Sequence, residues 1–457
     1  MGPNLEAAAE AVRKAGWADR CWLVGGAVRD DLLGGPESED IDIVVLGDAV
    51  QAARDLFDQG IADGPPAVYA RFGTAMVRVG PLKLEFASSR AESYSPGSRK
   101  PNVRPASLDM DAYRRDFTVN TLLRSTATGE LADPLGTGLA DLSAQVLRTP
   151  GDPVVSFADD PLRLYRAVRF RWKLDFEYAE VLPDAIRREA HRTAMLSAER
   201  VRDELSQILM LQQAGAALDE AESFGLLARV SPEFAEMRKV GVGKYHHLDA
   251  WAHTCRVVDA TPFDLATRLA AWLHDIGKPA TAEVQGDKVT FYGHETVGAD
   301  MARDVLHRLR FPEALAATVE QLVRGHMRFS APQPPGPAGL RRVVRDFGED
   351  VGRLLDLVEA DRSALRPGFD LGDVEELRRR LEETARATPQ ETLESPLSGQ
   401  EVIRLLDLSP GPEVGAWKRA LAEAVLEGEV PAGDKEAAES WLLETRNRLN
   451  KKPVSDG

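Results

Sequence analysis

The amino-acid sequence predicts an α+β protein, in which a small mixed α/β head precedes a long, all-helical body. In the first 145 residues, short β-prone apolar runs alternate with glycine and proline, as in "CWLVGG", "IDIVVLG", "TAMVRVG" and "LKLEFASS". From about residue 155, apolar residues recur with the period of a helix, as in "DPLRLYRAVRFRWKL". One later stretch, "AEVQGDKVTFYG", suggests a hairpin. A chain of 457 residues has room for roughly two to four such domains.

The composition is that of an ordinary globular protein, with 43% hydrophobic and 28% charged residues, so collagen-like and disordered classes are excluded. No apolar run is long enough to span a membrane, and the start, "MGPNLEAAAEAVRKAGW", resembles an amphipathic helix rather than a signal peptide. Cys21 and Cys255 are the only cysteines, which excludes a disulfide framework. We therefore expect a cytoplasmic protein.

The formal net charge of -16 argues against a protein that coats nucleic acid by bulk attraction. One segment, from Arg90 to Arg115, is locally basic. Its basic residues are Arg90, Arg99, Lys100, Arg104, Arg114 and Arg115. Because phosphate contacts depend on where the basic residues lie, a local nucleic-acid groove remains compatible with the acidic total.

A glycine pair follows the first predicted strand. Gly25 and Gly26 come after "CWLV", and a helix is expected to begin at "AVRDDLLG". Backbone N–H groups beside a helix start bind phosphate, and Arg29 adds a positive charge. Taken alone, however, a glycine pair after a strand more often marks only a tight turn.

Two aspartates, Asp40 and Asp42, open the next predicted strand. Side chains two residues apart on a strand point to the same face, so the two carboxylates converge. Like charges are costly together unless a cation joins them, and Mg²⁺ prefers oxygen ligands. Glu85, on the predicted strand "LKLEFAS", is a candidate third carboxylate. The alternative is that these carboxylates only face solvent.

The glycine turn, Arg29, Asp40 and Asp42 together resemble the head motif of polymerase-β-type nucleotidyltransferases, and more specifically of bacterial tRNA CCA-adding enzymes and their poly(A) polymerase relatives. The resemblance implies a polymerase-β-like head. It also implies that Asp40, Asp42 and Glu85 are catalytic, that Asp40 and Asp42 bind Mg²⁺, and that the glycine pair and Arg29 bind nucleotide. The implied partners are tRNA, CTP and ATP.

A second block, "YRRDFTVNTLL", contains Arg114, Arg115, Asp116 and Asn120. It resembles the family's Arg-Arg-Asp-Phe-Thr block, which implies contact with the ribose and triphosphate of the incoming nucleotide. A pair of arginines can donate bidentate hydrogen bonds to phosphate oxygens, and Asp116 can accept a hydrogen bond from a sugar hydroxyl. The alternative is a capped helix with a basic start.

A third block, "DDPLRLYRAVRFRWKLDF", has Asp160, Arg163, Arg166 and Arg169 at intervals of three residues, so that adjacent members share one helix face. It resembles the family's helix whose side chains select the base. The resemblance implies that Asp160 and Arg163 hydrogen-bond the edge of C or A, and that Arg166 and Arg169 bind phosphate or hold the helix. The family usually has Glu at the position of Asp159. Without the resemblance, a salt-bridged amphipathic helix is as good an interpretation.

The likeness extends over about residues 20–210 and includes a fourth block, "SAERVRDELSQIL", in which Glu199 and Arg200 receive no chemical role. The stretch between "SSRAE" and "YRRDF" has full length. In the family it corresponds to a mobile loop that assists adenosine addition and is shortened in enzymes that add only CC. Its presence therefore disfavours a CC-only enzyme.

Most of the histidines gather in one later region, which contains His253, the adjacent His274 and Asp275, His294 and His326. Imidazoles and carboxylates are suitable ligands for a divalent transition metal. The spacing resembles an HD-type phosphohydrolase domain, which implies a metal site formed by His253, His274, Asp275 and Asp361. The alternative is a helical scaffold that no longer turns over substrate.

Four parts are expected along the chain: a nucleotidyltransferase head (1–145), a helical neck with the base-selecting helix (146–235), an HD-type domain (236–370) and a C-terminal helical module (371–457). The last part resembles the family's tRNA-contacting module. It ends in "KKPVSDG", which is expected to be disordered.

The sequence therefore predicts an Mg²⁺-dependent enzyme that adds the 3' CCA end to tRNA without a nucleic-acid template. The alternatives are an A-adding tRNA nucleotidyltransferase, or a poly(A) polymerase, which the acidic C-terminal region disfavours. From other classes, an HD phosphohydrolase and a non-catalytic RNA-binding factor remain. The sequence does not indicate an oligomeric state.

Overall fold

The structure, a computed structural model, describes residues 1–69, 73–93, 102–105, 107–240, 249–285, 288–329, 335–365 and 373–450. The chain forms two compact units, of which the first comprises Met1–Gln213 and Ala217–Arg229 and the second comprises Ala214–Ala216 and Val230–Gly457. The expected disordered tail and much of the proline-rich stretch near residue 330 lie outside the described residues. The four-part division expected from the sequence stays a prediction.

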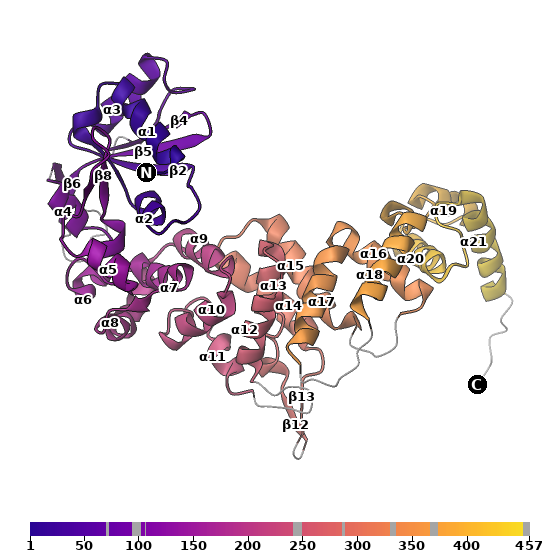
Figure 1. The fold of residues 1–457 in the computed structure, drawn as a ribbon. Coiled ribbons are helices and arrows are strands. Elements are labelled where there is room, and N and C mark those ends of the chain that lie inside the picture. The colour runs from indigo at the N-terminus through magenta and orange to yellow at the C-terminus, as the bar shows by residue number, and fades with distance from the viewer. Residues whose placement is uncertain are drawn as a thin grey trace. The chain divides into compact units, whose positions relative to one another are not determined.

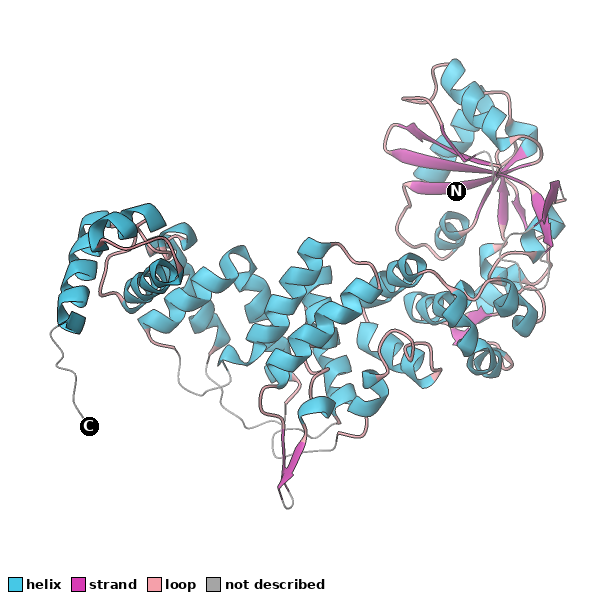
Figure 2. Ribbon diagram, turned by 180° about the vertical axis from the view of Figure 1, so that it is seen from behind, coloured by secondary structure: helices cyan, strands magenta, loops and turns pink. Residues whose placement is uncertain are grey.

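A mixed sheet, with seven strands among the described residues, forms the centre of the first unit (Figures 1 and 2). Its strand order is β3-β4-β5-β2-β1-β8-β9. The strands are β1 (Cys21–Val24), β2 (Asp40–Val45), β3 (Ala67–Tyr69), β4 (Thr74–Val79), β5 (Leu82–Ser88), β8 (Leu123–Ser125) and β9 (Leu131–Ala132). β2 and β5 run parallel, whereas β2 and β1 run antiparallel. The four strands expected from the sequence are confirmed as β1, β2, β4 and β5.

Alternating burial explains how this sheet presents its carboxylates. In β2, Ile41 and Ile43 are buried, whereas Asp40 and Asp42 are exposed. Helix α3 (Ala49–Asp58) contacts β4 and β5, and its buried residues recur at helical spacing. Asp48 caps this helix by accepting hydrogen bonds from two backbone N–H groups of its first turn. Core packing of the isoleucines thus leaves both aspartates on the opposite face of the strand.

Helices surround the sheet and continue beyond it in the first unit. They are α1 (Pro3–Lys14), α2 (Gly26–Leu32), α4 (Leu108–Tyr113), α5 (Gly138–Ala144), α6 (Pro153–Asp159), α7 (Leu162–Leu174), α8 (Leu182–Glu189) and α9 (Ala198–Leu209). Helix α10 (Ala214–Ser223) contains the boundary between the units. Two small ribbons, β6 (Arg90–Ser93) with β7 (Asn102–Pro105) and β10 (Val146–Leu147) with β11 (Glu177–Tyr178), were not expected from the sequence.

The second unit is helical apart from one hairpin in its described residues, β12 (Glu283–Gln285) with β13 (Lys288–Thr290), which confirms the sequence prediction. Its helices are α11 (Glu233–Met237), α12 (Ala250–Ala260), α13 (Leu265–Leu273), α14 (His294–Arg308), α15 (Glu313–Gly325), α16 (Pro337–Phe347), α17 (Val351–Ser363), α18 (Val374–Ala387), α19 (Gly399–Leu406), α20 (Pro412–Glu427) and α21 (Lys435–Asn450).

Helix α13 is the centre of this unit, because every residue from Ala266 to Leu273 is buried. It contacts α12, α14, α15 and α17. Phe234 stacks on Trp272 with ring centroids 4.8 Å apart and also lies against Trp251. Within the described part of the chain, no helix is both long and apolar enough to cross a membrane.

Candidate functional site

The glycine turn after β1 is fitted closely to one carboxylate of β2. Gly25 has φ +80°, a conformation that side-chain-bearing residues rarely adopt. A Cβ atom at this position would lie 3.0 Å from Asp42 Oδ2. Val24 and Asp42 are register partners, which explains the close approach. Glycine is therefore required here both by the backbone conformation and by the nearness of Asp42.

Arg29 does not lie where the sequence analysis expected it. Its side chain is only 1% exposed and lines neither of the clefts described below. Nη1 donates to Asn120 Oδ1 at 2.6 Å and Nε donates to Asp30 Oδ1 at 2.7 Å. In this arrangement Arg29 is a buried link between α2 and the Arg-Arg-Asp-Phe-Thr block. Direct phosphate binding would require this guanidinium to leave its partners.

The carboxylates of β2 and β5 face a lysine that the sequence analysis overlooked. The parallel register places Asp42 beside Glu85 and Asp40 beside Lys83. Lys83 Nζ lies 2.5 Å from Glu85 Oε1 and 3.4 Å from Asp40 Oδ1. Lys83 and Glu85 are two residues apart on one strand, so their shared face was readable from the sequence.

The electrostatics of this group favour a bound cation. Removal of water around the Asp42 carboxylate raises its pKa, and the charges of Glu85 and Asp40 raise it further, while Arg115 opposes them. Oxygen donors of this kind suit Mg²⁺. Among the described residues, Asp40, Asp42 and Glu85 do not each place an oxygen within 4.8 Å of the other two. Metal binding would therefore draw Asp40 and Glu85 away from Lys83.

Asp42, Lys83 and Glu85, but not Asp40, line a cleft of about 330 Å³, which we call the carboxylate cleft. Its charged lining residues are Asp42, Lys83, Glu85, Arg114 and Arg115. The arginine pair is held by a buried carboxylate on α4, because Asp111 accepts from Arg114 Nε at 2.9 Å and from Arg115 Nη2 at 3.1 Å. Asp111 was not predicted, although its spacing of three and four residues on a helix was readable.

A second cleft, of about 400 Å³, shares Arg114 with the first, and we call it the tyrosine cleft. It is lined by Met110, Tyr113, Arg114, Pro150, Gly151, Asp152, Val155, Ser156, Asp159 and Arg163. Arg163 donates to Ser156 Oγ at 2.7 Å and to the carbonyl of Arg114. One of the two residues expected to select the base therefore lies at this cleft.

The other expected base-selecting residue, Asp160, lies just before α7 rather than on it. Its backbone is extended, and its Oδ1 accepts from the backbone N–H of Leu162 at 3.2 Å. Arg200 Nη2 donates to both oxygens of Asp160, at 3.1 and 3.0 Å. Arg200, which received no role from the sequence, is thus the ionic partner of Asp160. The neighbouring Asp159, and not Asp160, lines the tyrosine cleft.

Asp116 forms the centre of a buried network. Its Oδ2 accepts from Arg166 Nε at 2.8 Å, and its Oδ1 accepts from Asn120 Nδ2 at 3.0 Å. Burial alone would raise the pKa of Asp116, but the charge of Arg166 and the hydrogen bond from Asn120 lower it to about 2. On the next turn of α7, Arg169 Nε donates to Glu204 Oε2 at 2.7 Å. Arg166 and Arg169 therefore hold α7 in place.

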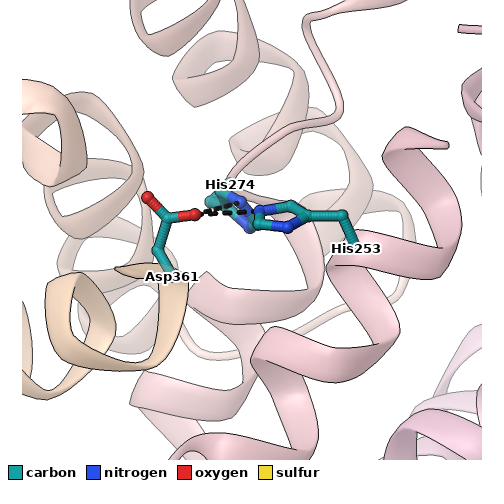
Figure 3. Close-up of side chains that lie close together, drawn as sticks. All are labelled: His253, His274 and Asp361. Atoms are coloured by element: carbon teal, nitrogen blue, oxygen red, sulfur yellow. Dashed lines mark hydrogen bonds and ion pairs between the residues drawn. The ribbon is translucent and has the colours of Figure 1, made fainter. Parts of the chain in front are cut away.

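The second unit contains a buried cluster of histidines and aspartates. His253 Nε2 lies 2.8 Å from Asp361 Oδ1, and His274 Nε2 lies 3.9 Å from the same atom (Figure 3). These side chains come from α12, from the end of α13 and from α17. One ligand atom from each of the three residues lies within 4.8 Å of the others. The structure therefore brings together residues that the sequence predicted as one metal site.

A second ligand group adjoins the first and consists of Asp275, His294 and His326. Asp275 Oδ1 lies 3.4 Å from His294 Nε2, and its Oδ2 lies 3.2 Å from His274 Nε2. The Nε2 atoms of His294 and His326 are 3.3 Å apart. Asp275 therefore joins the two groups. His294 and His326 lie outside the ligand set predicted from the sequence.

Hydrogen bonds to backbone carbonyls fix the tautomers of three histidines in this cluster. The Nδ1 atoms of His274, His294 and His326 lie 2.8, 2.8 and 2.6 Å from the backbone carbonyls of Ala271, Phe291 and Val323. A carbonyl only accepts, so each Nδ1 carries a hydrogen and, in the neutral ring, each Nε2 presents a lone pair to the cluster. Burial and the neighbouring His274 lower the pKa of His326 to about 3, which keeps it neutral. This donor set fits a transition metal.

Lys278 was also not predicted as part of this cluster. Its buried Nζ lies 2.6 Å from Asp275 Oδ2. Burial raises the pKa of Asp275, but the charge that His274 carries when protonated and the ammonium group of Lys278 hold the pKa of that carboxyl well below its usual range. Asp275 is therefore charged. Burial opposes a charge on His274, but Asp275 and Asp361 raise its pKa, so a metal ion at His274 Nε2 would compete with a proton.

Three segments of the chain match known protein families. Residues 21–148 match the family described as the Poly A polymerase head domain, residues 175–238 match the "Probable RNA and SrmB- binding site of polymerase A", and residues 245–361 match the HD domain.

Individual relatives cover most of the chain. It is 36% identical to an A-adding tRNA nucleotidyltransferase of Deinococcus radiodurans, over 75% of this chain and 81% of the relative. It is 34% identical to a CC-adding tRNA nucleotidyltransferase of Thermus thermophilus, over 92% of both chains. Among solved structures, the CCA-adding enzyme of Bacillus stearothermophilus in complex with CTP is 25% identical, with a TM-score of 0.71 over 99% of each chain.

The Asp116 network generates a prediction on stability. The folded state holds the pKa of Asp116 at about 2, below its ordinary value of 3.8. Because the pKa of Asp116 is lowered in the folded state, the ionised carboxylate stabilises the fold above pH ~4. This contribution to the free energy of unfolding is lost as the pH falls from ~4 to ~2. We expect Asp116→Asn to lower the free energy of unfolding by about 2 kcal/mol at pH 7, and by clearly less at pH 3. Urea denaturation at the two pH values measures this.

The matched control is Asp184→Asn, because Asp184 forms an ion pair with Arg187 on the protein surface. It is expected to change stability little at either pH. Equal destabilisation by Asp116→Asn at pH 7 and pH 3 would contradict the assignment, since the loss would then not depend on the charge.

Proposed function

Because the chain belongs to the tRNA nucleotidyltransferase family, we propose that it completes the 3' CCA end of tRNA from CTP and ATP. One observation carries the proposal: the carboxylate cleft and the tyrosine cleft share Arg114. A single ligand can then place its phosphates beside Asp42 and Glu85 and its base beside Arg163. Two basic residues, Arg114 and Arg115, supply the charge that a triphosphate needs.

The choice of full CCA addition rests on several supports. The relatives include A-adding, CC-adding and multifunctional CCA proteins, so the family alone does not select among them. The stretch between "SSRAE" and "YRRDF", residues 93–112, which corresponds to the loop used for adenosine addition, has full length, and residues 94–101 and 106 lie outside the described residues. The acidic C-terminal region disfavours poly(A) synthesis. A-only addition is the remaining alternative.

The residues of the carboxylate cleft have separable roles. Asp40, Asp42 and Glu85 would hold Mg²⁺, which when bound would acidify the 3'-hydroxyl and neutralise charge on the pyrophosphate. Arg114 and Arg115 bind triphosphate oxygens, and Asp111 keeps both guanidinium groups oriented toward them. Lys83 balances the negative charge of Asp40 and Glu85. Gly25 leaves room for Asp42, and Arg29 links the helix that follows the glycine turn to Asn120.

Base selection is assigned to Asp160 and Arg163. C and A share an exocyclic amine beside a ring nitrogen that accepts hydrogen bonds, whereas U and G present the opposite arrangement. A carboxylate that accepts from the amine and a guanidinium that donates to the ring nitrogen fit C and A alone. Arg163 lies at the tyrosine cleft, which supports this role. Asp160 would have to share its carboxylate between the base and Arg200.

A second function is proposed for the histidine cluster, namely phosphoester hydrolysis by the HD domain. His253, His274, Asp275 and Asp361 would bind one divalent transition metal, and Asp275, His294 and His326 offer a second position. The tautomers fixed by three backbone carbonyls favour this function over an inert scaffold. Such a metal would supply an activated water for attack on phosphorus.

The setting proposed for this enzyme is the cytoplasm. The tRNA substrates named for its relatives support it, as do the two free, buried cysteines, Cys21 and Cys255.

The direct test of nucleotide addition uses labelled tRNA that ends before the first C, after CC and after CCA. Each substrate is offered CTP or ATP, singly and together, and the products are sized on a sequencing gel. We expect the first tRNA to gain CCA with both nucleotides, the second to gain one A, and the third to gain nothing. Extension of the second tRNA alone would support the A-adding alternative instead.

The matched controls are Asp40→Ala and Asp42→Ala. Each removes a carboxylate from the exposed face of β2 and leaves the core intact, so both proteins should fold while losing nucleotide addition. Near-normal addition by both variants would refute the assignment of the head.

Base selection is tested with Asp160→Ala. The substitution leaves the exocyclic amine of the base without its acceptor, so we expect kcat/KM for CTP and ATP to fall by an amount that corresponds to about 1–3 kcal/mol of lost transition-state stabilisation. Discrimination against UTP and GTP should fall as well. Steady-state kinetics with all four nucleotides measure both effects.

Two comparison variants separate the possible outcomes. Arg115→Ala should weaken the binding of all four nucleotides alike, since phosphate contacts carry no information about the base. Arg29 is not suitable for this comparison, because its side chain is buried. Asp159→Ala tests the carboxylate that lines the cleft. If Asp159→Ala relaxes selectivity while Asp160→Ala does not, the role belongs to Asp159.

The HD proposal predicts that metal binding and nucleotide addition are separable. His274→Ala combined with Asp275→Ala should abolish bound transition metal, measured by elemental analysis, and any phosphatase activity. Addition of CCA should persist. His307→Ala, an exposed histidine outside the cluster, should keep the metal. A wild-type protein that retains no transition metal after purification in its presence would favour the scaffold interpretation.

A further inference from the structure

Three exposed apolar side chains gather on the tyrosine cleft. Tyr113 is 61% exposed, Val155 is 56% exposed and Met110 is 45% exposed, and all three line the cleft. Side chains this exposed add little to the core. Apolar groups gathered at one concave site, with a few polar groups beside them, are typical of a surface that binds a ligand.

The position of the Tyr113 ring is set by the surrounding backbone. A Cβ atom on Gly151 would lie 2.5 Å from the Tyr113 hydroxyl oxygen and 2.8 Å from Cζ. The hydroxyl end of the ring therefore rests on the Gly151 backbone, in space that a side chain would otherwise occupy. Met110 and Tyr113 are three residues apart on α4 and so share one face of the helix. The apolar surface is thus built by two separate elements of the fold.

The charges beside this surface identify its ligand. Arg114 and Arg163 lie at the same cleft, and Arg114 also lines the carboxylate cleft. A flat group with apolar faces, a polar edge and attached phosphates matches this combination. We propose that Tyr113, with Met110 and Val155, forms the stacking platform for the base of the incoming nucleoside triphosphate. The proposal rests on the proposed nucleotide addition.

The platform assigns Tyr113 a role distinct from base selection. Stacking on an aromatic ring is available to every base, because every base has a π-face. Tyr113 therefore holds C and A alike, while discrimination stays with groups that contact the base edge. The shared Arg114 favours the incoming nucleotide over the 3' end of the tRNA, because it connects the platform with the cleft that receives the triphosphate.

The test compares Tyr113→Ala, Tyr113→Phe and Gly151→Ala with the wild-type enzyme. KM for CTP is measured with tRNA ending before the first C, and KM for ATP with tRNA ending in CC. Tyr113→Ala should raise both values by about tenfold or more, with selectivity against UTP and GTP unchanged. Tyr113→Phe keeps the ring and should stay within about twofold. In Gly151→Ala the new methyl group displaces the ring, so both KM values should rise.

The control is Tyr292→Ala, which removes a more exposed tyrosine (80%) from the second unit and should change neither value. Unchanged KM values for CTP and ATP in Tyr113→Ala or in Gly151→Ala overturn the platform. A rise confined to KM for tRNA also overturns it, because the tRNA end would then be the occupant. If the wild-type enzyme adds no nucleotide, the proposed function fails instead, so the two failures are distinguishable.

Discussion

The ion pair between the buried Asp116 and the half-buried Arg166 connects the parts of the first unit that carry both clefts. Asp116 follows directly on the arginine pair, and Arg166 lies one helical turn after Arg163 on α7. Asn120 extends the connection, because it donates to Asp116 and accepts from Arg29 on α2. The distance between the arginines proposed to bind phosphate and the residues proposed to select the base therefore depends on this network. Because Asp116 is buried, loss of its charged partner would leave a costly unpaired carboxylate, which favours this one arrangement.

The same unit keeps its reactive carboxylates in an energetically unfavourable position. Asp42 lies beside Glu85 in the strand register, and Gly25 is placed so that no side chain separates the turn from Asp42. Lys83 pairs with Asp40 and Glu85 and so reduces the repulsion among the three carboxylates. The pKa of Asp42 nevertheless remains raised. A site held in this state gains stability when a cation arrives. The strand register therefore gathers the carboxylates at the place where we propose that a metal ion binds.

The limits of the sequence predictions have physical causes. The longer strands, β1, β2, β4 and β5, were predictable from apolar runs, whereas β8 and β9 are too short to carry a period. Asp42, Glu85 and Arg115 were predicted and share one cleft. The burial of Arg29 was not predictable, because it depends on Asn120, 91 residues further along the chain. Likewise, Arg200 gained a role only when folding brought it to Asp160.

An enzyme that adds two bases of different size must bind both of them and still exclude the other two bases. A pocket shaped to one base would reject the other, because apolar shape discriminates by size. Stacking on Tyr113 tolerates both sizes, since it uses only the face of the base. Selection can then depend on the donor and acceptor pattern of the edge, which C and A share. A site that leaves a buried polar group unpaired rejects the wrong edge strongly. In the proposed arrangement an aromatic platform holds the base while Asp160 and Arg163 contact its edge, which allows both C and A to bind while U and G are excluded.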